Sequence, residues 1–171
     1  QFSNDARIEV DHGATLTIKS TCSNANGITR SHLYACGTGW TGIHLDDNYS
    51  LLSIDDALIE NAQSAVSSHN SGEFHITNSD FFNNTTSVWA TDGNYSSCTV
   101  TRNNFDCPSC GGNTSGIEHI SANHAEGLTI NGNLIKNCEI GIHSNHKSTT
   151  HALGNTFRDI SNAGIFAEND G

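Results

Sequence analysis

The stretch Phe74-His-Ile-Thr-Asn-Ser-Asp-Phe-Phe-Asn83 decides the fold, because the same frame recurs at Leu52–Asn61 and at Leu128–Asn137. Each copy opens apolar-polar-apolar, carries another apolar residue five positions later, and closes on an amide. The alternation at the opening is typical of a β-strand with one buried face. Neighbouring copies start about 22 residues apart, which is too short for an independent fold. The repeats must therefore stack to bury their apolar sides.

Three series of apolar residues mark the repeat along the chain. They are Ile54, Ile76, Val100 and Ile130; then Ile59, Phe81, Phe105 and Ile135; then Ile43, Val66, Val88, Ile117, Ile142 and Ile165. Short strands that alternate with corners, without a helical period between them, predict an all-β, right-handed parallel β-helix. We expect residues 1–171 to form a single domain of about six coils, with loop insertions at 21–40 and 107–116.

An amide or acid follows the second apolar mark in most copies. We interpret these residues as a ladder of stacked corner side chains, since Asn tolerates the left-handed backbone of a tight turn. The predicted ladder consists of Asn61, Asn83, Asn137 and Asp159.

Composition restricts the setting and the partners. Seven Lys and Arg against 18 Asp and Glu give a net charge of −11, which disfavours nucleic acid as a partner. No apolar run is long enough to span a membrane. Six cysteines indicate an oxidising, extracytoplasmic location, and we predict disulfides Cys22–Cys36 and Cys107–Cys110. The chain starts at Gln1 and lacks Met, so we expect it to be a segment of a larger protein.

The beginning of the chain resembles a known group of proteins. Ala6-Arg-Ile-Glu-Val10, His12-Gly-Ala-Thr-Leu-Thr-Ile18 and Gly39-Trp-Thr-Gly-Ile43 are similar to the opening of secreted β-helix proteins of Bacteroidetes-type bacteria. The resemblance covers Ala6 to about Asp47, followed by generic β-helix repeats. It implies a large exported surface or secreted parent protein whose partners include export or attachment machinery.

One polar cluster is the best candidate site. Counted from the Ile43 series, Asp46 and His69 share one outward position, and Asp47 and Asp92 share the next. Carboxylates that converge in this way either bind Ca²⁺ or raise one pKa for acid–base catalysis. The simpler alternative is a solvated polar face at the strand ends.

Aromatic and histidine side chains supply further candidates. Trp89 is predicted to face outward, and together with Tyr95 it is a candidate for stacking on sugar rings. Several histidines gather in the last third of the chain, where solvated loop residues are the simpler interpretation. They are His119, His124, His143, His146 and His151.

Two functional hypotheses remain. The first is a non-catalytic extracellular β-helix segment, a rigid spacer or an adhesin-like face that contacts carbohydrate. The alternative is a polysaccharide lyase or glycoside hydrolase that uses the acidic cluster, with calcium as the possible cofactor. Pectin hydrolases carry Asp pairs with Gly-His-Gly, and pectate lyases carry calcium-binding acids with a catalytic Arg, but neither signature is present. Few cations are available to neutralise a uronate, so catalysis is the weaker hypothesis.

Overall fold

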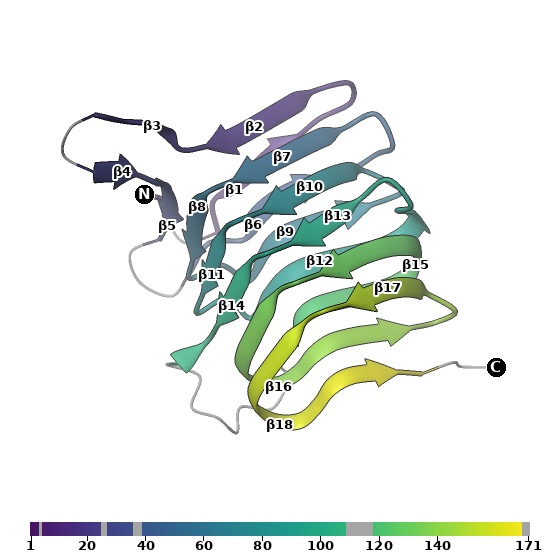
Figure 1. Cartoon of the computed structure of the whole chain (residues 1–171). Coiled ribbons are helices and arrows are strands. Elements are labelled where there is room, and N and C mark those ends of the chain that lie inside the picture. The colour runs from purple at the N-terminus through teal and green to yellow at the C-terminus, as the bar shows by residue number, and fades with distance from the viewer. Residues whose placement is uncertain (4, 25–26, 36–38, 109–117, 169–171) are drawn as a thin grey trace.

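The chain is wound into a parallel β-helix whose successive coils stack along one axis, from the purple N-terminal end to the yellow C-terminal end (Figure 1). The computed structural model describes residues 1–3, 5–24, 27–35, 39–108 and 118–168, and it gives no side-chain placement for 21–29, 118 and 119. The strands run as follows: β1 Arg7–Val10, β2 Thr15–Lys19, β3 Thr21–Asn24, β4 Gly27–Thr29, β5 Ser31–Tyr34, β6 Gly42–Leu45, β7 Leu51–Asp55, β8 Ala57–Glu60, β9 Ser64–His69, β10 Glu73–Thr77, β11 Asp80–Phe82, β12 Thr86–Asn94, β13 Thr99–Thr101, β14 Asn104–Asp106, β15 Glu118–Asn131, β16 Leu134–Asn145, β17 Thr149–Leu153 and β18 Thr156–Ala167.

The strand pairing gives the described coils three faces. Face A consists of β2, β7, β10, β13, the end of β15 and β17; face B consists of β5, β8, β11, β14 and the first parts of β16 and β18. Face C consists of β1, β6, β9, β12, the start of β15 and the later parts of β16 and β18. The three long strands β15, β16 and β18 each bend from one face to the next. All of these pairs are parallel, which confirms the predicted right-handed parallel β-helix.

Residues with positive φ mark the corners between the faces, as tight turns in L-residues require. The A–B corner has Asp56, Asn78, Arg102, Gly132 and Gly154; the B–C corner has Asn61, Asn83, Asn137 and Asp159; the C–A corner has Asn70, Ser71, Asp92, His124, His146 and Lys147. The four residues predicted as the Asn ladder are thus the corner residues of one edge. Their bonding to one another stays a prediction.

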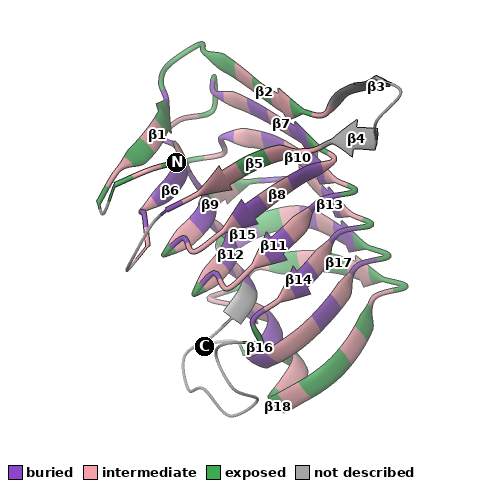
Figure 2. Cartoon of the chain, turned by 90° about the vertical axis from the view of Figure 1, so that its left-hand side faces the viewer, coloured by how far each residue is buried: buried purple, intermediate pink, exposed green. Residues whose placement is uncertain are grey.

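The apolar marks fill the interior in register. Ile54, Ile76, Val100 and Ile130 pair in sequence, and each is fully buried. The second series is also fully buried, and the rings of Phe81 and Phe105 stack with centroids 4.9 Å apart. Figure 2 shows this alternation of buried and less buried residues along the strands, which fades in the last coil at β18.

The third predicted series of apolar residues, which begins at Ile43, is wrong at one position. Val88 pairs with Ile120, and Ile120 pairs with Ile142, so Ile120 occupies the position predicted for Ile117. Ile117 itself lies outside the described residues. The reason is the second insertion, which makes this coil longer than its neighbours. In the sequence, both Ile117 and Ile120 therefore fit the apolar position of the repeat. Outward positions counted from Ile117 are therefore displaced by three residues.

The first predicted insertion, 21–40, includes structure of its own. Strands β3 and β4 pair with each other in antiparallel fashion, whereas β5 joins face B by parallel pairing with β8. The second predicted insertion, 107–116, lies mostly outside the described residues.

Candidate functional site

Trp89, one of the two residues predicted to stack on sugar rings, lies on the outer side of face C. His44, Ser67, Trp89, Ser121 and His143 lie in one row across five neighbouring strands. Trp89 is half-buried and places its ring edge-on to His69, with centroids 5.2 Å apart and planes at 75°. Its neighbours in the row, Ser67 and Ser121, are small. Trp89 is therefore the one large side chain at the middle of this row, and it faces outward as predicted.

The Asp47 side chain forms hydrogen bonds that stabilise the turn after β6. Its carboxylate accepts hydrogen bonds from the backbone N–H of Tyr49 (3.0 Å) and the Ser50 hydroxyl (2.9 Å), and it contacts Nδ1 of His12 at 2.5 Å. Burial opposes ionisation, but these hydrogen bonds prevail and lower the pKa of Asp47. Asp46 next to it is exposed. Asp47 is therefore an ionised residue that caps the turn, whereas the Asp46 side chain is exposed to solvent.

Asp92 lies on a later coil, at the C–A corner. Its carboxylate accepts a hydrogen bond from the Thr91 hydroxyl (2.9 Å) and lies 3.1 Å from Nδ1 of His124. These two hydrogen bonds, together with the nearby charges of His124 and His69, lower the pKa of Asp92 although burial opposes the shift. Asp92 thus stays ionised at neutral pH.

The predicted acidic cluster is only partly assembled. Asn70 lies on the coil between those of Asp47 and Asp92, and its side-chain amide reaches the Asp46 carbonyl at 3.5 Å. Among the residues that the structure describes, no three His, Cys, Asp or Glu side chains form a group that could hold a metal ion. A calcium site at Asp46, Asp47 and Asp92 is therefore not preformed.

Two histidines that the sequence analysis interpreted more simply as solvated loop residues, His124 and His146, lie at the same corner. The correct register places Asp92, His124 and His146 one above another, because Thr91 pairs with Asn123 and Asn123 pairs with Asn145. The rings of His124 and His146 lie 5.1 Å apart between centroids. We call Asp92, His124 and His146 the corner triad. Counting from Ile120 instead of Ile117 would have revealed it.

Tyr95 is the one sugar-stacking candidate that the structure corrects. Its side chain is 0 % exposed, and its hydroxyl donates toward the carbonyl oxygens of Ser68 (2.8 Å) and Thr91 (2.7 Å). Tyr95 is therefore a core residue that ties the end of β12 to the coil before it. An outside ligand cannot reach it.

A hydrogen-bonded ladder of side chains exists at the A–B corner, directly after the positive-φ residues. Asn103 Nδ2 donates to Asn133 Oδ1 at 3.1 Å, and Asn133 Nδ2 donates to Asn155 Oδ1 at 2.9 Å. Each oxygen also accepts the backbone N–H of the residue one coil earlier: Ser79 to Asn103, Asn103 to Asn133 and Asn133 to Asn155. This ladder is structural, because it satisfies buried backbone groups at the bend.

The predicted disulfides fall largely on residues whose side chains are not described. Cys22, Cys36 and Cys110 are among them, and Cys107 is buried. Both pairings therefore stay predictions. Cys98 and Cys138 are buried free thiols, and burial raises their pKa values to about 11 and about 12.

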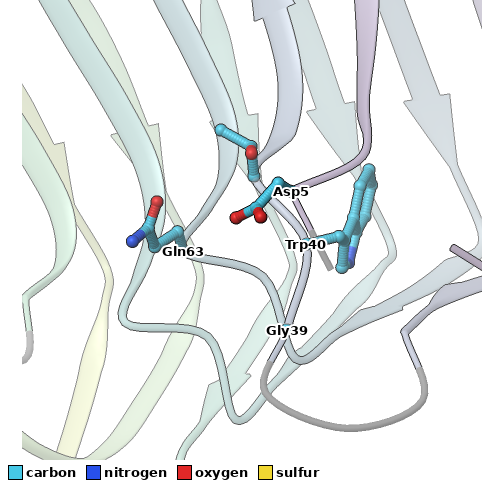
Figure 3. A pocket seen from close by; sticks show the side chains of 5 residues that line it. Asp5, Gly39, Trp40 and Gln63 are labelled. Atoms are coloured by element: carbon cyan, nitrogen blue, oxygen red, sulfur yellow. The ribbon is translucent and has the colours of Figure 1, made fainter. Parts of the chain in front are cut away.

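A polar pocket of about 260 Å³ lies near the B–C corner of the second coil. Asp5, Gly39, Trp40 and Gln63 line it, together with Thr41 (Figure 3). The Trp40 indole is buried, stacks on Phe2 with centroids 4.3 Å apart, and donates to the Glu60 carbonyl at 3.0 Å. The pocket thus presents mainly polar groups rather than an aromatic platform.

Comparison with known proteins gives a family for the chain. No curated protein and no solved structure matches it significantly. Residues 2–170 match the family described as "Periplasmic copper-binding protein (NosD)". This periplasmic family agrees with the predicted β-helix and with an extracytoplasmic location, whereas a Bacteroidetes origin is not shown. No helix in the described part of the chain is long and apolar enough to span a membrane. The match covers nearly the whole sequence, so the chain belongs to the NosD family.

Proposed function

We propose that the chain is a non-catalytic segment of an exported protein, a rigid β-helix spacer whose face C contacts extracellular carbohydrate. Trp89 carries this proposal, because its half-buried indole projects from the outer side of face C between two serines. An aromatic ring at such a position offers an apolar surface to the C–H groups of a sugar. His69, which contacts the Trp89 ring, holds the indole in place.

The electrostatics of the acidic residues support a role without turnover. A glycosidase needs one carboxyl group with a raised pKa as its general acid. The two carboxylates with a resolved shift in the predicted cluster, Asp47 and Asp92, shift in the opposite direction. A lyase needs a cation to neutralise the substrate carboxylate. Arg102 is a corner residue of the A–B edge, and Arg7, in β1 of face C, is paired with the Glu9 carboxylate at 2.9 Å.

Binding to a glycan array, with Ca²⁺ and with EDTA, tests the carbohydrate proposal. We expect Trp89→Ala to weaken binding at least about tenfold, the equivalent of about 1.4 kcal/mol. Tyr49→Ala is the matched control, because Tyr49 is 63 % exposed but lies outside the Trp89 row. Equal binding by the wild type and Trp89→Ala would refute the assigned contact. Release of cleaved product would refute the non-catalytic role.

The family description raises the question of copper, and the donor chemistry gives a partial answer. Thioether and thiolate ligands favour Cu(I), but the sequence has no Met, and the thiols of Cys98 and Cys138 are buried and hard to ionise. Imidazole nitrogens suit Cu(II). In the described part of the chain, the corner triad provides two of them side by side. We therefore propose Cu²⁺ as the form of copper that this chain can hold.

A further inference from the structure

We infer that an extended, neutral polysaccharide chain binds along face C, parallel to the β-helix axis, from Trp89 on β12 to Phe166 on β18, and that its hydroxyls bond to Asn123 and Asn145. The inference rests on the proposed carbohydrate contact at Trp89. It adds the direction, the length and the charge of the glycan.

Trp89 and Phe166 are aromatic residues of one outward row on face C. Strand pairing joins Trp89 to Ser121, Ser121 to His143 and His143 to Phe166. Trp89 is half-buried, and Phe166 is 37 % exposed. The residues between them present little apolar surface, because Ser121 is small and only 13 % of the His143 side chain is exposed. From β12 to β18, the two rings are therefore the apolar contacts that this row offers to a ligand.

Two amides lie beside the same row, on the strands between the two rings. Asn123 in β15 and Asn145 in β16 pair with each other and follow Ser121 and His143 by two residues. Among the residues that the structure describes, neither amide Oδ1 atom has a hydrogen-bond partner, although both atoms are buried. A buried acceptor without a partner is unfavourable, and a new hydrogen bond removes this cost. Because both side chains are partly exposed, rotation of each amide turns its oxygen toward a ligand hydroxyl.

The placement of these four side chains gives the direction of the ligand. Each comes from a different strand, so the contact points follow the axis of the β-helix. Adjacent strands lie about 4.8 Å apart, and the three spacings from Trp89 to Phe166 therefore amount to about 14 Å. A ligand laid along one strand would meet only one of the two rings. An extended polysaccharide laid along the axis meets both, and each of its sugars presents hydroxyls at an interval close to the strand spacing.

The charges beside the row indicate a neutral glycan. Carboxylates lie at the ends of three face C strands: Asp46 directly follows β6, Asp92 is in the last part of β12, and Glu168 directly follows β18. The whole chain carries a net charge of −11. Because like charges repel, uronate or sulfate groups on a glycan are disfavoured here, whereas hydroxyl groups are not.

Calorimetric titration of the intact chain with linear oligosaccharides tests the inference. The probes are β-1,4-linked gluco-, xylo- and manno-oligosaccharides of two to six sugars, and oligogalacturonates of the same lengths are the acidic comparison. We expect the affinity for neutral oligosaccharides to rise up to about four sugars, one for each of the strands β12, β15, β16 and β18, and then to stay constant. Oligogalacturonates should bind at least about tenfold more weakly.

Two variants identify the contacts beyond Trp89. Asn145→Ala should lower the affinity for the tetrasaccharide about three- to tenfold, which corresponds to one hydrogen bond. Phe166→Ala should remove the gain in affinity from the fourth sugar. Both variants should bind the disaccharide as the wild type does, because a disaccharide at Trp89 does not reach β16. Asn131→Ala is the matched control, since Asn131 is an exposed amide on face A.

The outcomes separate this inference from the proposed function. Circular dichroism should show the β-structure of the wild type in each variant, because Phe166 is exposed and Oδ1 of Asn145 makes no hydrogen bond to the described residues. If Trp89→Ala weakens binding but Asn145→Ala and Phe166→Ala leave the tetrasaccharide affinity unchanged, the contact at Trp89 stands and the axial path is overturned.

Binding by Trp89→Ala equal to that of the wild type would refute the proposed contact and this inference together. Tighter binding of oligogalacturonates, or no binding of any neutral oligosaccharide, would overturn the inference alone. Equal loss in Asn131→Ala would also overturn it, because binding would then not be specific to face C.

Discussion

Removal of the middle amide of the A–B ladder should destabilise the β-helix strongly. Asn133 is 1 % exposed and makes hydrogen bonds on both sides of its coil. Its Nδ2 donates to the Val100 carbonyl at 2.9 Å, and its Oδ1 accepts the Asn103 backbone N–H at 2.9 Å. The change Asn133→Ala removes both of these bonds, and it takes the side-chain partner from the Asn103 N–H.

The expected magnitude follows from the groups that lose a partner and those that do not. Asn155 Oδ1 still accepts the backbone N–H of residue 133, and Asn103 Nδ2 still donates to the Ile76 carbonyl. The Asn103 N–H loses its partner, which costs about 1–3 kcal/mol, whereas the Val100 carbonyl, in a strand paired with β15, loses one bond worth about 0.5–1.5 kcal/mol. We therefore expect Asn133→Ala to lower the free energy of unfolding by about 1.5–4.5 kcal/mol.

Asn155→Ala provides the matched comparison. It removes the same kind of contacts, a bond to the Ile130 carbonyl and one from the Asn133 N–H, but Asn155 is only half-buried. Because water can replace the lost partners there, we expect a loss of about 1 kcal/mol. Urea unfolding followed by circular dichroism measures both, given a single transition with unchanged slope. Equal losses in the two variants, or a loss below about 1 kcal/mol for Asn133→Ala, would refute the ladder's role.

Three further predictions concern the core, the turn cap and the thiols. Phe81→Ala should cost about 3–5 kcal/mol because it empties a fully buried ring position stacked on Phe105; urea midpoints would contradict this if the loss were below about 1 kcal/mol. The stabilisation by Asp47, whose pKa is lowered in the folded chain, is complete above the ordinary Asp pKa of about 3.9 and is lost as the pH falls through the lowered value. The difference in melting temperature between the wild type and Asp47→Ala should thus shrink as the pH falls below about 4, and a constant difference would exclude the carboxylate as the cause. Cys98 and Cys138, with raised thiol pKa values, should resist alkylation at about pH 8 in the folded chain, and denaturation without reductant should expose these two thiols alone if both predicted disulfides form. Six reactive thiols would contradict the disulfides.

The sequence predicted the coil because its core positions are chemically distinct. In a chain without helical periodicity, large apolar residues at a fixed spacing, such as Ile54 and Ile76, indicate stacked coils with a shared core. Both residues are fully buried and paired in register. The count failed only after the second insertion, where Ile117 and Ile120 were equally apolar choices. Hydrophobic pattern alone cannot decide between two such residues, because the insertion has no fixed length.

The corner chemistry was harder to predict because neighbouring residues have similar side chains. At the B–C corner, Asn83 and Asn84 are adjacent amides, yet Asn83 takes the left-handed conformation and Asn84 is fully buried. The buried one receives the Ala62 backbone N–H at 2.8 Å. Composition does not distinguish the two roles. Position does: at both the A–B and the B–C corners, the amide that bonds to the backbone of the preceding coil directly follows the residue with positive φ.

The same register argument explains why the proposed metal site depends on some parts of the chain and not on others. Asp92 and His124 are joined across the long insertion, but strand pairing between β12 and β15 restores their alignment on both sides of it. His124 and His146 are joined directly by β15 and β16. A single-residue deletion within β16 would shift side chains from one side of the strand to the other and separate the two imidazoles. A deletion within residues 109–117 would leave the β15–β16 pairing intact. The deletion within residues 109–117 should therefore preserve copper binding, whereas the deletion within β16 should abolish it.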